Sequence, residues 1–465
     1  MAKLSLNEKD LRKLGYPETR AIGVAIQVMH QFYKHASMEE AKEILSQVLA
    51  NPESFREHAV LEKIASCLLD EKRTRHEEIS LNIKRKEYAV FGAEHIEPGA
   101  INQMEIAMKL PVTVAGALMP DAHQGYGLPI GGVLATEHAV IPYGVGVDIG
   151  CRMCMSIFDL PASMTEQETD KLKNVLQRET LFGAGMEFKN PMDDEVLERK
   201  EFQEIKMLKS LQSKAAKQIG SSGSGNHFVE FGVVEISNAD NRLNLAPGKY
   251  LALLSHSGSR GLGATIAGYY TKLAMEQCKL PGVARHLAWL DLNSEAGQEY
   301  WLAMNLAGDY ASACHHQIHK KVKRSLGAQL LATVENHHNF AWKEMYEGRE
   351  VIVHRKGATP AGKGVLGIIP GSMTDPGYVV SGAGEISSLN SAAHGAGRRM
   401  SRTAAKNVIN QKMMDEVLKK YAVTLIGGDI DEAPMAYKNI REVMQSQMEL
   451  VNVEGVFYPR VVRMA

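Results

Sequence analysis

The first 85 residues carry apolar side chains at three- and four-residue spacing, the pattern of amphipathic helices. This spacing predicts three helical segments: LRKLG, AIGVAIQVMHQFYKHA and a longer stretch that begins with SMEEAKEILSQVLA and runs to EEISL. At the start of the third, Ser37 is expected to cap a helix and Glu40 to complete a capping box, and Asn51-Pro52 should end that helix. Residues 1–85 are therefore predicted to form a separate helical N-terminal extension.

From Tyr88 onward the pattern changes to short apolar, β-branched segments separated by glycine and proline, which predicts strands. Examples are VTVAGALMPDAH, GGVLAT and YLALLSHSG. Two helical patterns interrupt the strands, at residues 164–218 and 296–327. Because this part of the sequence contains no fixed-period repeat, low-complexity tract or linker signature, residues 86–465 are predicted to form one large α+β domain.

Charge and composition narrow the class of protein. Lys and Arg total 53 against 54 Asp and Glu, so nucleic acid would have to bind through a local basic patch. The sequence has neither a run of ~18 apolar residues that could span a membrane nor the apolar core of a secretory signal. The five cysteines are odd in number and irregularly spaced, which is typical of reduced thiols. A cytoplasmic protein with no membrane partner is predicted.

Glycine-rich turns after short strands contain most of the residues suited to chemistry. The first group, MPDAHQGYGLPIGG followed by VGVDIGCRM, contains Asp121, His123, Asp148 and Cys151. A carboxylate and a thiolate three residues apart in a glycine loop can face one divalent ion, and a thiolate can bridge two. The structural alternative is a turn carboxylate beside a buried, inert thiol. A redox role for CRMC is disfavoured because no thioredoxin-like βαβ unit surrounds it.

Two further turns contribute histidines. In GSSGSGNHFVEFG, a period of two predicts that Asn226, Phe228 and Glu230 share one face of a strand. His227 would then point to the other face, where it could be a metal ligand or a satisfied core residue. The turn LLSHSGSRGLG adds His256 and the backbone of a candidate anion nest, with a polar hairpin turn as the alternative.

The remaining turns supply more histidines and a set of cations. ENHHNFAW and VHRKGATPAGKG leave the choice of a further ligand open between His338 and His354. In SLNSAAHGAGRRMSR, His394 lies in a small-residue loop backed by arginines, which suits attack on an α-phosphate as well as simple phosphate binding. The cations expected to contact phosphate or RNA are Arg260, Arg355, Lys356 and Arg398.

Two patterns are expected to carry no such chemistry. His315 and His319 have zinc-like spacing on a helix, but no third ligand is adjacent and a solvated helix face is predicted. The sequence also has no P-loop of the G-x-x-x-x-G-K-[ST] type, so any nucleotide must be held by other means.

Nine motifs together resemble the RtcB family of RNA ligases, and the resemblance spans residues 88–465. They occur in the family's order, as PDAHQGYGLPIGGVLAT, GVDIGCRM, GSGNHFVE, SHSGSRGLG, HHNFAW, HRKGATPA, IPGSM, HGAGRRMSR and DEAPMAYK. The resemblance implies an RtcB-like α+β fold, a centre of two Mn²⁺ ions and the use of GTP. It also implies that RNA 3'-phosphate or 2',3'-cyclic phosphate ends are joined to 5'-hydroxyl ends through a histidine-GMP intermediate, in RNA repair or tRNA splicing.

The resemblance implies roles for individual residues. The implied nucleophile is His394, which would be guanylylated. The implied metal ligands are Asp148, Cys151, His227, His256 and His338, with the Cys151 thiolate bridging. The implied nucleotide-binding residues are Asn226, Phe228, Glu230, Asn339, Pro370, Gly371, Ser372, Met373, Gly395, Ala396, Gly397 and Tyr437.

This chain departs from the family pattern in two places near the implied base. Gly377 replaces a serine, and Met464-Ala465 replaces a Lys-Gly ending, so two base contacts are missing and the choice between GTP and ATP stays open. Two other functions are compatible with the residues: a metal-dependent hydrolase of RNA-end phosphates, and a non-catalytic RNA-binding factor. RNA with broken ends, from tRNA or rRNA, is the expected partner, and an activating protein partner is left open.

Overall fold

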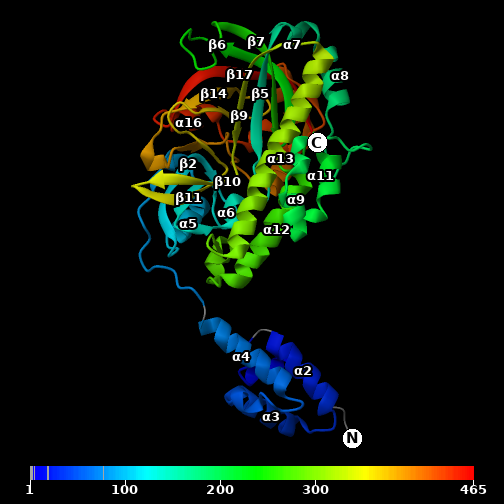
Figure 1. The fold of residues 1–465 in the computed structure, drawn as a ribbon, viewed down its shortest axis with the longest axis vertical. Helices are drawn as coiled ribbons and strands as arrows, with labels where there is room; N and C mark the ends of the chain where they lie inside the picture. Colours follow the sequence, from blue (N-terminus) through cyan, green and yellow to red (C-terminus); the bar gives the residue numbers. More distant parts are fainter. Residues whose placement is uncertain (1–3, 5, 18–19, 77) are drawn as a thin grey trace. The chain divides into compact units, whose positions relative to one another are not determined.

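The computed structural model of the chain describes residues 4, 6–17, 20–76 and 78–465. The chain divides into two compact units, Met1–Ile79 and Ser80–Ala465, so the division falls slightly before the expected residue 85 (Figure 1). Within the described part of the chain, no helix is both long and apolar enough to cross a membrane.

The smaller unit is built from helices around a core of its own. Its helices are α1 (Glu8–Lys13), α2 (Arg20–Phe32), α3 (Met38–Ala50) and α4 (Glu62–His76). Residue 77, near the end of the third segment expected from the sequence, lies outside the described residues. The predicted capping box of α3 is confirmed: Ser37 accepts a hydrogen bond from the Glu40 amide, and the Glu40 carboxylate accepts one from the Ser37 amide. Leu11, Leu45 and Ile64 are fully buried in this core.

Two sheets form the larger unit, with mixed helix and sheet content as predicted. The eight-stranded sheet contains, in spatial order, β13 (Leu366–Ile369), β14 (Gly377–Gly382), β17 (Val451–Met464), β6 (Phe228–Ile236), β7 (Gly248–Ser257), β5 (Arg152–Pro161) and β9 (Leu330–His337), with β16 (Thr424–Ile426) beside β17. The five-stranded sheet contains β1 (Ala89–Val90), β2 (Thr113–His123), β3 (Ile130–Thr136), β11 (Arg349–Lys356) and β10 (Phe340–Tyr346). Short ladders join β12 (Ala358–Pro360) to β15 (Ser391–Ala393) and β4 (Ala139–Val140) to β8 (Leu290–Asp291). The strands predicted from VTVAGALMPDAH, GGVLAT and YLALLSHSG are confirmed as β2, β3 and β7.

The helices of this unit include one long element that packs on the larger sheet. The helix predicted at 296–327 is confirmed as α13 (Glu295–Leu326), which Ser294 caps and Gly327 ends at a φ of 66°. It packs against β5 and β7 (Figure 1). Further helices of this unit are α5 (Pro98–Ala107), α6 (Pro142–Val145), α12 (Arg260–Gln277), α14 (Arg402–Val408), α15 (Gln411–Lys420) and α16 (Ile440–Gln445).

The helical pattern predicted at 164–218 is only partly confirmed. It forms five separate helices: α7 (Met164–Gln167), α8 (Thr169–Glu179), α9 (Glu201–Glu204), α10 (Lys206–Lys209) and α11 (Gln212–Gln218). The largest gap follows α8, where Gly183 and Gly185 have φ values of 122° and 71° and Pro191 cannot donate a helix hydrogen bond.

The register of the larger sheet brings distant motifs to one edge. At the start of β5, Arg152 pairs with Ser257 of β7 on one side and with His337 of β9 on the other. Phe228, the first residue of β6, pairs with His256. Four of the residues with metal-binding chemistry therefore lie at the ends of adjacent strands: Cys151, His227, His256 and His338.

The prediction that His315 and His319 lie on a solvated helix face is wrong, because both rings are buried between α13 and the sheet. His315 Nε2 donates to the Ser257 carbonyl at 3.1 Å, so its Nδ1 accepts from Ser255 Oγ at 2.6 Å. Ser255 Oγ in turn accepts from His319 Nε2 at 2.8 Å, and His319 Nδ1 accepts from Ser156 Oγ at 2.8 Å. Hydrogen bonds within the protein thus use all four ring nitrogens, although a thiol lies nearby at Cys154.

Replacing Ser255 with alanine should destabilise the larger unit. The substitution leaves one nitrogen of His315 and one of His319 buried without a partner, at a cost of about 1–3 kcal/mol for each group. Denaturant unfolding would measure the free-energy change, with the exposed Ser163→Ala, which removes no capping bond, as the control. An unfolding midpoint equal to that of the control would contradict the proposed hydrogen-bond chain.

Candidate active site

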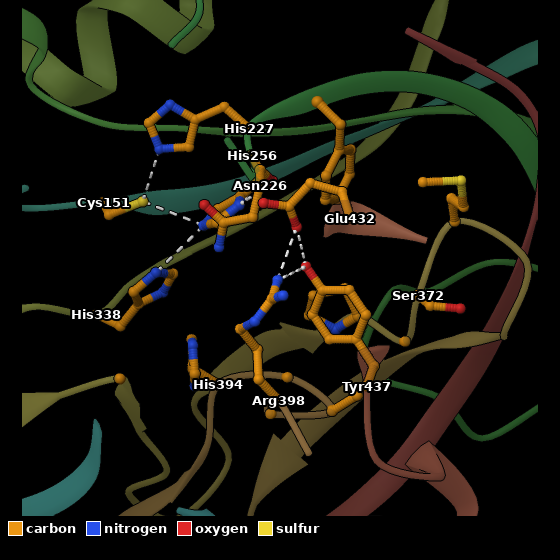
Figure 2. A pocket seen from close by; sticks show the side chains of 18 of the residues that line it. Cys151, Asn226, His227, His256, His338, Ser372, His394, Arg398, Glu432 and Tyr437 are labelled. Carbon is orange, nitrogen blue, oxygen red and sulfur yellow. Dashed lines mark hydrogen bonds and ion pairs between the residues drawn. The ribbon is translucent and has the colours of Figure 1, made fainter. Parts of the chain in front are cut away.

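One cavity of about 400 Å³ gathers most of the residues that the sequence singled out. Figure 2 shows side chains from the strand ends on one side and the His394 loop on the other. The predicted metal ligands all line it: Asp148, Cys151, His227, His256 and His338. So do all twelve predicted nucleotide-binding residues, together with His394, Lys356 and Arg398.

The predicted metal ligands converge on one another. Cys151 Sγ lies 3.5 Å from His227 Nε2 and 3.1 Å from His256 Nε2. His227 Nε2 is 3.0 Å from Asp148 Oδ2, and the Nε2 atoms of His256 and His338 are 3.3 Å apart. The thiol and the three imidazoles therefore present their ligand atoms to the same small volume (Figure 2), and the Asp148 carboxylate reaches it through His227.

The hydrogen bonds around this cluster suit a metal ion. His256 Nδ1 donates to the Asn226 carbonyl at 3.1 Å, so the ring proton is on Nδ1 and the Nε2 lone pair faces the cluster. That lone pair meets the sulfur of Cys151 and a second imidazole nitrogen, from His338, which is an arrangement that a cation would stabilise. Mixed thiolate, imidazole and carboxylate ligands suit divalent transition metals, so these residues fit such an ion.

The electrostatics favour the ligand forms of His256, His338 and Asp148, but not of Cys151. Burial and the neighbouring histidines lower the pKa of His256 to about 3 and hold that of His338 well below its usual value, so both rings are neutral. Burial would raise the pKa of Asp148, but the hydrogen bond and charge of His227 outweigh it and lower the pKa to about 2. Burial and Asp148 raise the pKa of the Cys151 thiol, so metal binding there must displace a proton.

His394 lies beside this cluster in a defined orientation. It follows β15, and its ring centroid is 4.8 Å from that of His338. Its Nδ1 donates to Asp121 Oδ2 at 2.6 Å, which leaves Nε2 with a lone pair. Asp121 is fully buried on β2. Gly397 packs against the Asp121 backbone so closely that a Cβ at position 397 would clash with the Asp121 carbonyl oxygen. The loop that carries His394 is thereby fixed against the five-stranded sheet.

Asp121 is a candidate functional residue that the sequence did not pair with His394. The motif PDAH indicated a carboxylate near the metal, but the structure pairs this side chain with His394, 273 residues further along the chain. A carboxylate that holds Nδ1–H of an imidazole fixes the tautomer and stabilises the ring when its other nitrogen becomes positively charged.

The far wall of the cavity comes from β6 and β17. Phe228 of β6 pairs with Met464 of β17, and both line the cavity together with Glu230 and Gly377. Burial raises the pKa of Glu230 well above its ordinary value. The prediction that His227 faces away from Phe228 and Glu230 is wrong, because β6 begins only at Phe228 and strand alternation does not extend back to residue 227.

A network of charges supports the third side of the cavity. The Arg398 guanidinium lies 5.2 Å from the centre of the Tyr437 ring, and its Nη2 donates to the Asp431 carbonyl at 2.7 Å. The Tyr437 hydroxyl donates to Glu432, which also pairs with Arg398 (Figure 2). Arg402 pairs with the other oxygen of Glu432. Glu432 and Arg402 line the cavity but were not predicted as site residues, although Glu432 lies within the motif DEAPMAYK.

Three predicted or considered residues lie outside the cavity. The predicted phosphate or RNA contact at Arg355 is contradicted, because its guanidinium is fully buried and bonded to Glu344 at 2.5 Å. Arg260 begins α12 and bonds to the Gly183 carbonyl at 3.1 Å. His354 Nε2 accepts from the Ile141 amide at 2.9 Å, so of the two histidines that the sequence left open only His338 faces the cluster.

Comparisons with known proteins show the family to which this chain belongs. The model of the family described as tRNA-splicing ligase RtcB matches residues 103–464. RNA-splicing ligase RtcB of Escherichia coli K12 is 32% identical over 394 residues, which cover 77% of this chain and 92% of that protein. tRNA-splicing ligase RtcB of Aeropyrum pernix is 32% identical over 410 residues, which cover 70% of this chain and 83% of that protein. The chain therefore belongs to the RtcB family.

Proposed function

We propose that this protein joins RNA 3'-phosphate or 2',3'-cyclic phosphate ends to 5'-hydroxyl ends through a GMP group carried on His394. The observation that carries the proposal is the placement of His394. Its Nδ1 is held by the buried Asp121 at 2.6 Å while its Nε2 is left with a lone pair, next to a cluster of metal-binding side chains. Membership of the RtcB family supports an RNA ligase as the reaction class.

The cluster of Asp148, Cys151, His227, His256 and His338 is proposed to hold two Mn²⁺ ions, with the Cys151 thiolate bridging. When bound, the metal would supply Lewis-acid stabilisation of charge on phosphoryl oxygens. Metal binding there would convert the buried Cys151 thiol to a thiolate, with release of its proton.

The proposed reaction divides a difficult phosphoryl activation into displacements that His394 can perform. His394 Nε2 attacks the α-phosphorus of GTP, the nitrogen–phosphorus bond forms and pyrophosphate leaves. Asp121 stabilises the ring, which carries a positive charge once Nε2 is bonded to phosphorus. A cyclic RNA end is first opened by water, the RNA 3'-phosphate then takes GMP from His394, and the 5'-hydroxyl finally displaces GMP to form the new phosphodiester.

The nucleotide is proposed to occupy the cavity between His394 and the wall formed by β6 and β17. Phe228 and Tyr437 offer aromatic faces, and Glu230 is the carboxyl group that would read the base edge. Gly377 and Met464 stand where the family offers polar base contacts, so guanine recognition rests largely on Glu230. The phosphates would lie toward Lys356, Arg398 and the Ser372 turn.

A hydrolase that only removes or opens terminal phosphates is the second candidate. It needs the metal cluster but not an oriented His394, so the bond between His394 and Asp121 favours the ligase. A non-catalytic RNA-binding factor would need neither. RNA fragments from tRNA or rRNA, in the cytoplasm, are the proposed substrates.

Joining of two short RNAs with defined ends would test the proposal. We expect the protein, with Mn²⁺ and GTP, to join a strand with a 3'-phosphate or 2',3'-cyclic phosphate to a strand with a 5'-hydroxyl. It should not join a 3'-hydroxyl strand to a 5'-phosphate strand. Removal of the terminal phosphate without any joined product would overturn the ligase and support the hydrolase.

A further inference from the structure

A second cavity of about 610 Å³ adjoins the one that contains the candidate metal ligands. Val147, the residue before Asp148, lines both cavities. The walls of the second cavity come from α12 and the segment after it on one side, and from Tyr143 and Val147 on the other. The two cavities therefore meet at Val147, and the proposed reaction gives the second one no role.

Three aromatic rings lie at the Tyr143 side of this cavity; we call Tyr126, Tyr143 and His286 the aromatic platform. The Tyr143 and His286 rings stack with centroids 5.1 Å apart and planes 29° apart. Tyr126 meets both rings edge-on, with centroids 6.4 Å and 5.9 Å away, and is 67% exposed. Burial and the charge of Arg285 lower the pKa of His286, which keeps its ring neutral and suited to stacking. Tyr126 is therefore largely exposed beside two rings that are stacked on each other.

Positive charge lines the second cavity. Lys272, Lys279 and Arg285 line the second cavity, and the single carboxylate among its lining residues, Glu276, lies 3.9 Å from Lys272. The cavity therefore carries three cations against one anion.

Lys356 connects the platform to the proposed active site. Its Nζ lies 4.9 Å from the centre of the Tyr143 ring and donates to the Tyr126 carbonyl at 2.6 Å, while the same side chain lines the cavity of His394. A ligand on the platform would therefore lie within one side chain of the proposed reaction centre.

We infer that the second cavity and the aromatic platform bind the unpaired nucleotides next to the RNA end being joined, with a base stacked on Tyr126 and backbone phosphates on Lys272, Lys279 and Arg285. This inference rests on the proposed function. Flat aromatic faces interleaved with cations are the chemistry that binds single-stranded RNA, because every base can stack and every linkage carries a negative charge. An acidic protein segment would use the cations but not the exposed ring face, so RNA is the occupant that uses both.

Binding of a labelled single-stranded uridine 12-mer with two hydroxyl ends, which the proposed reaction cannot join, would test this inference without turnover. Tyr126→Ala should weaken binding roughly 5- to 100-fold, the range for one lost base stack, while Tyr126→Phe keeps the ring and the affinity. In a plot of log affinity against log salt concentration, the double variant Lys272→Ala/Lys279→Ala should reduce the slope by about 1.4, since each phosphate contact to a single strand contributes about 0.7. A blunt duplex of the same length should bind with no dependence on Tyr126.

Tyr421→Ala is the matched control, because Tyr421 is also exposed and also lies beside a lysine, Lys420. RNA affinity that falls equally in Tyr126→Ala and Tyr421→Ala, or in neither, would overturn the inference and leave the cavity to an acidic protein partner. Labelling of the wild-type protein by GTP separates this inference from the proposed function. RNA binding that depends on Tyr126 in a protein that GTP never labels would sink the ligase and keep the platform.

Discussion

Replacing Cys151 with alanine is expected to remove the bound metal and with it all RNA joining. Cys151 Sγ lies within 3.5 Å of two imidazole nitrogens, so its loss opens the centre of the cluster rather than its edge. Loss of a residue that only supports a ligand typically costs 10–100-fold in metal affinity, so loss of a bridging ligand should cost more than about 100-fold. Titration with Mn²⁺, followed by metal analysis of the protein, would measure the change.

The control for this substitution is Cys154→Ala, because Cys154 is a second buried thiol, on β5, three residues after Cys151. It lies with His315 and His319 rather than in the Cys151 cluster, so this variant should bind as much metal as the unmodified protein. Equal metal content in Cys151→Ala and Cys154→Ala would contradict the assignment of the metal site.

Asp121→Asn is expected to slow the attachment of GMP to His394 by roughly 10³- to 10⁴-fold, as loss of the equivalent carboxylate does in a catalytic triad. An asparagine can donate its own N–H to Nδ1, and the ring proton then moves to Nε2, the atom that must attack. It also removes the negative charge that stabilises the phosphorylated ring. Rapid-mixing measurement of label transfer from GTP to protein would give the rate.

Two measurements distinguish this effect from a general loss of structure. The Mn²⁺ content of Asp121→Asn should equal that of the unmodified protein, because Asp121 bonds to His394 and not to the metal cluster. The exposed Asp170→Asn should leave the labelling rate unchanged. Labelling of Asp121→Asn at the unmodified rate would show that His394 needs no carboxylate.

Features with a local signal were predictable from the sequence. The strand β2 and the helix α13 follow from the period of their apolar residues, and the α3 capping box follows from two residues three apart. Glycine-rich turns in the sequence also marked many of the residues that line the main cavity. These turns follow strands whose ends meet at one edge of a sheet.

Features that depend on tertiary contacts were not predictable. Arg355 looked available to phosphate in its motif, but Glu344 on the neighbouring strand neutralises it inside the protein. His315 and His319 were expected on a solvated helix face because no third ligand is adjacent to them in the sequence, whereas they face serines on two strands of the sheet. A short motif cannot show which distant side chain will meet it.

The most direct test of the proposed chemistry is incubation with Mn²⁺ and α-labelled GTP or ATP, with the wild-type protein beside His394→Ala. The expected result is acid-labile, alkali-stable label from GTP on the wild-type protein only. Label from ATP instead would keep His394 as the nucleophile and assign a changed base preference to the pocket that contains Gly377 and Met464. No label from either nucleotide, on protein shown to contain metal, would contradict the histidine-GMP ligase.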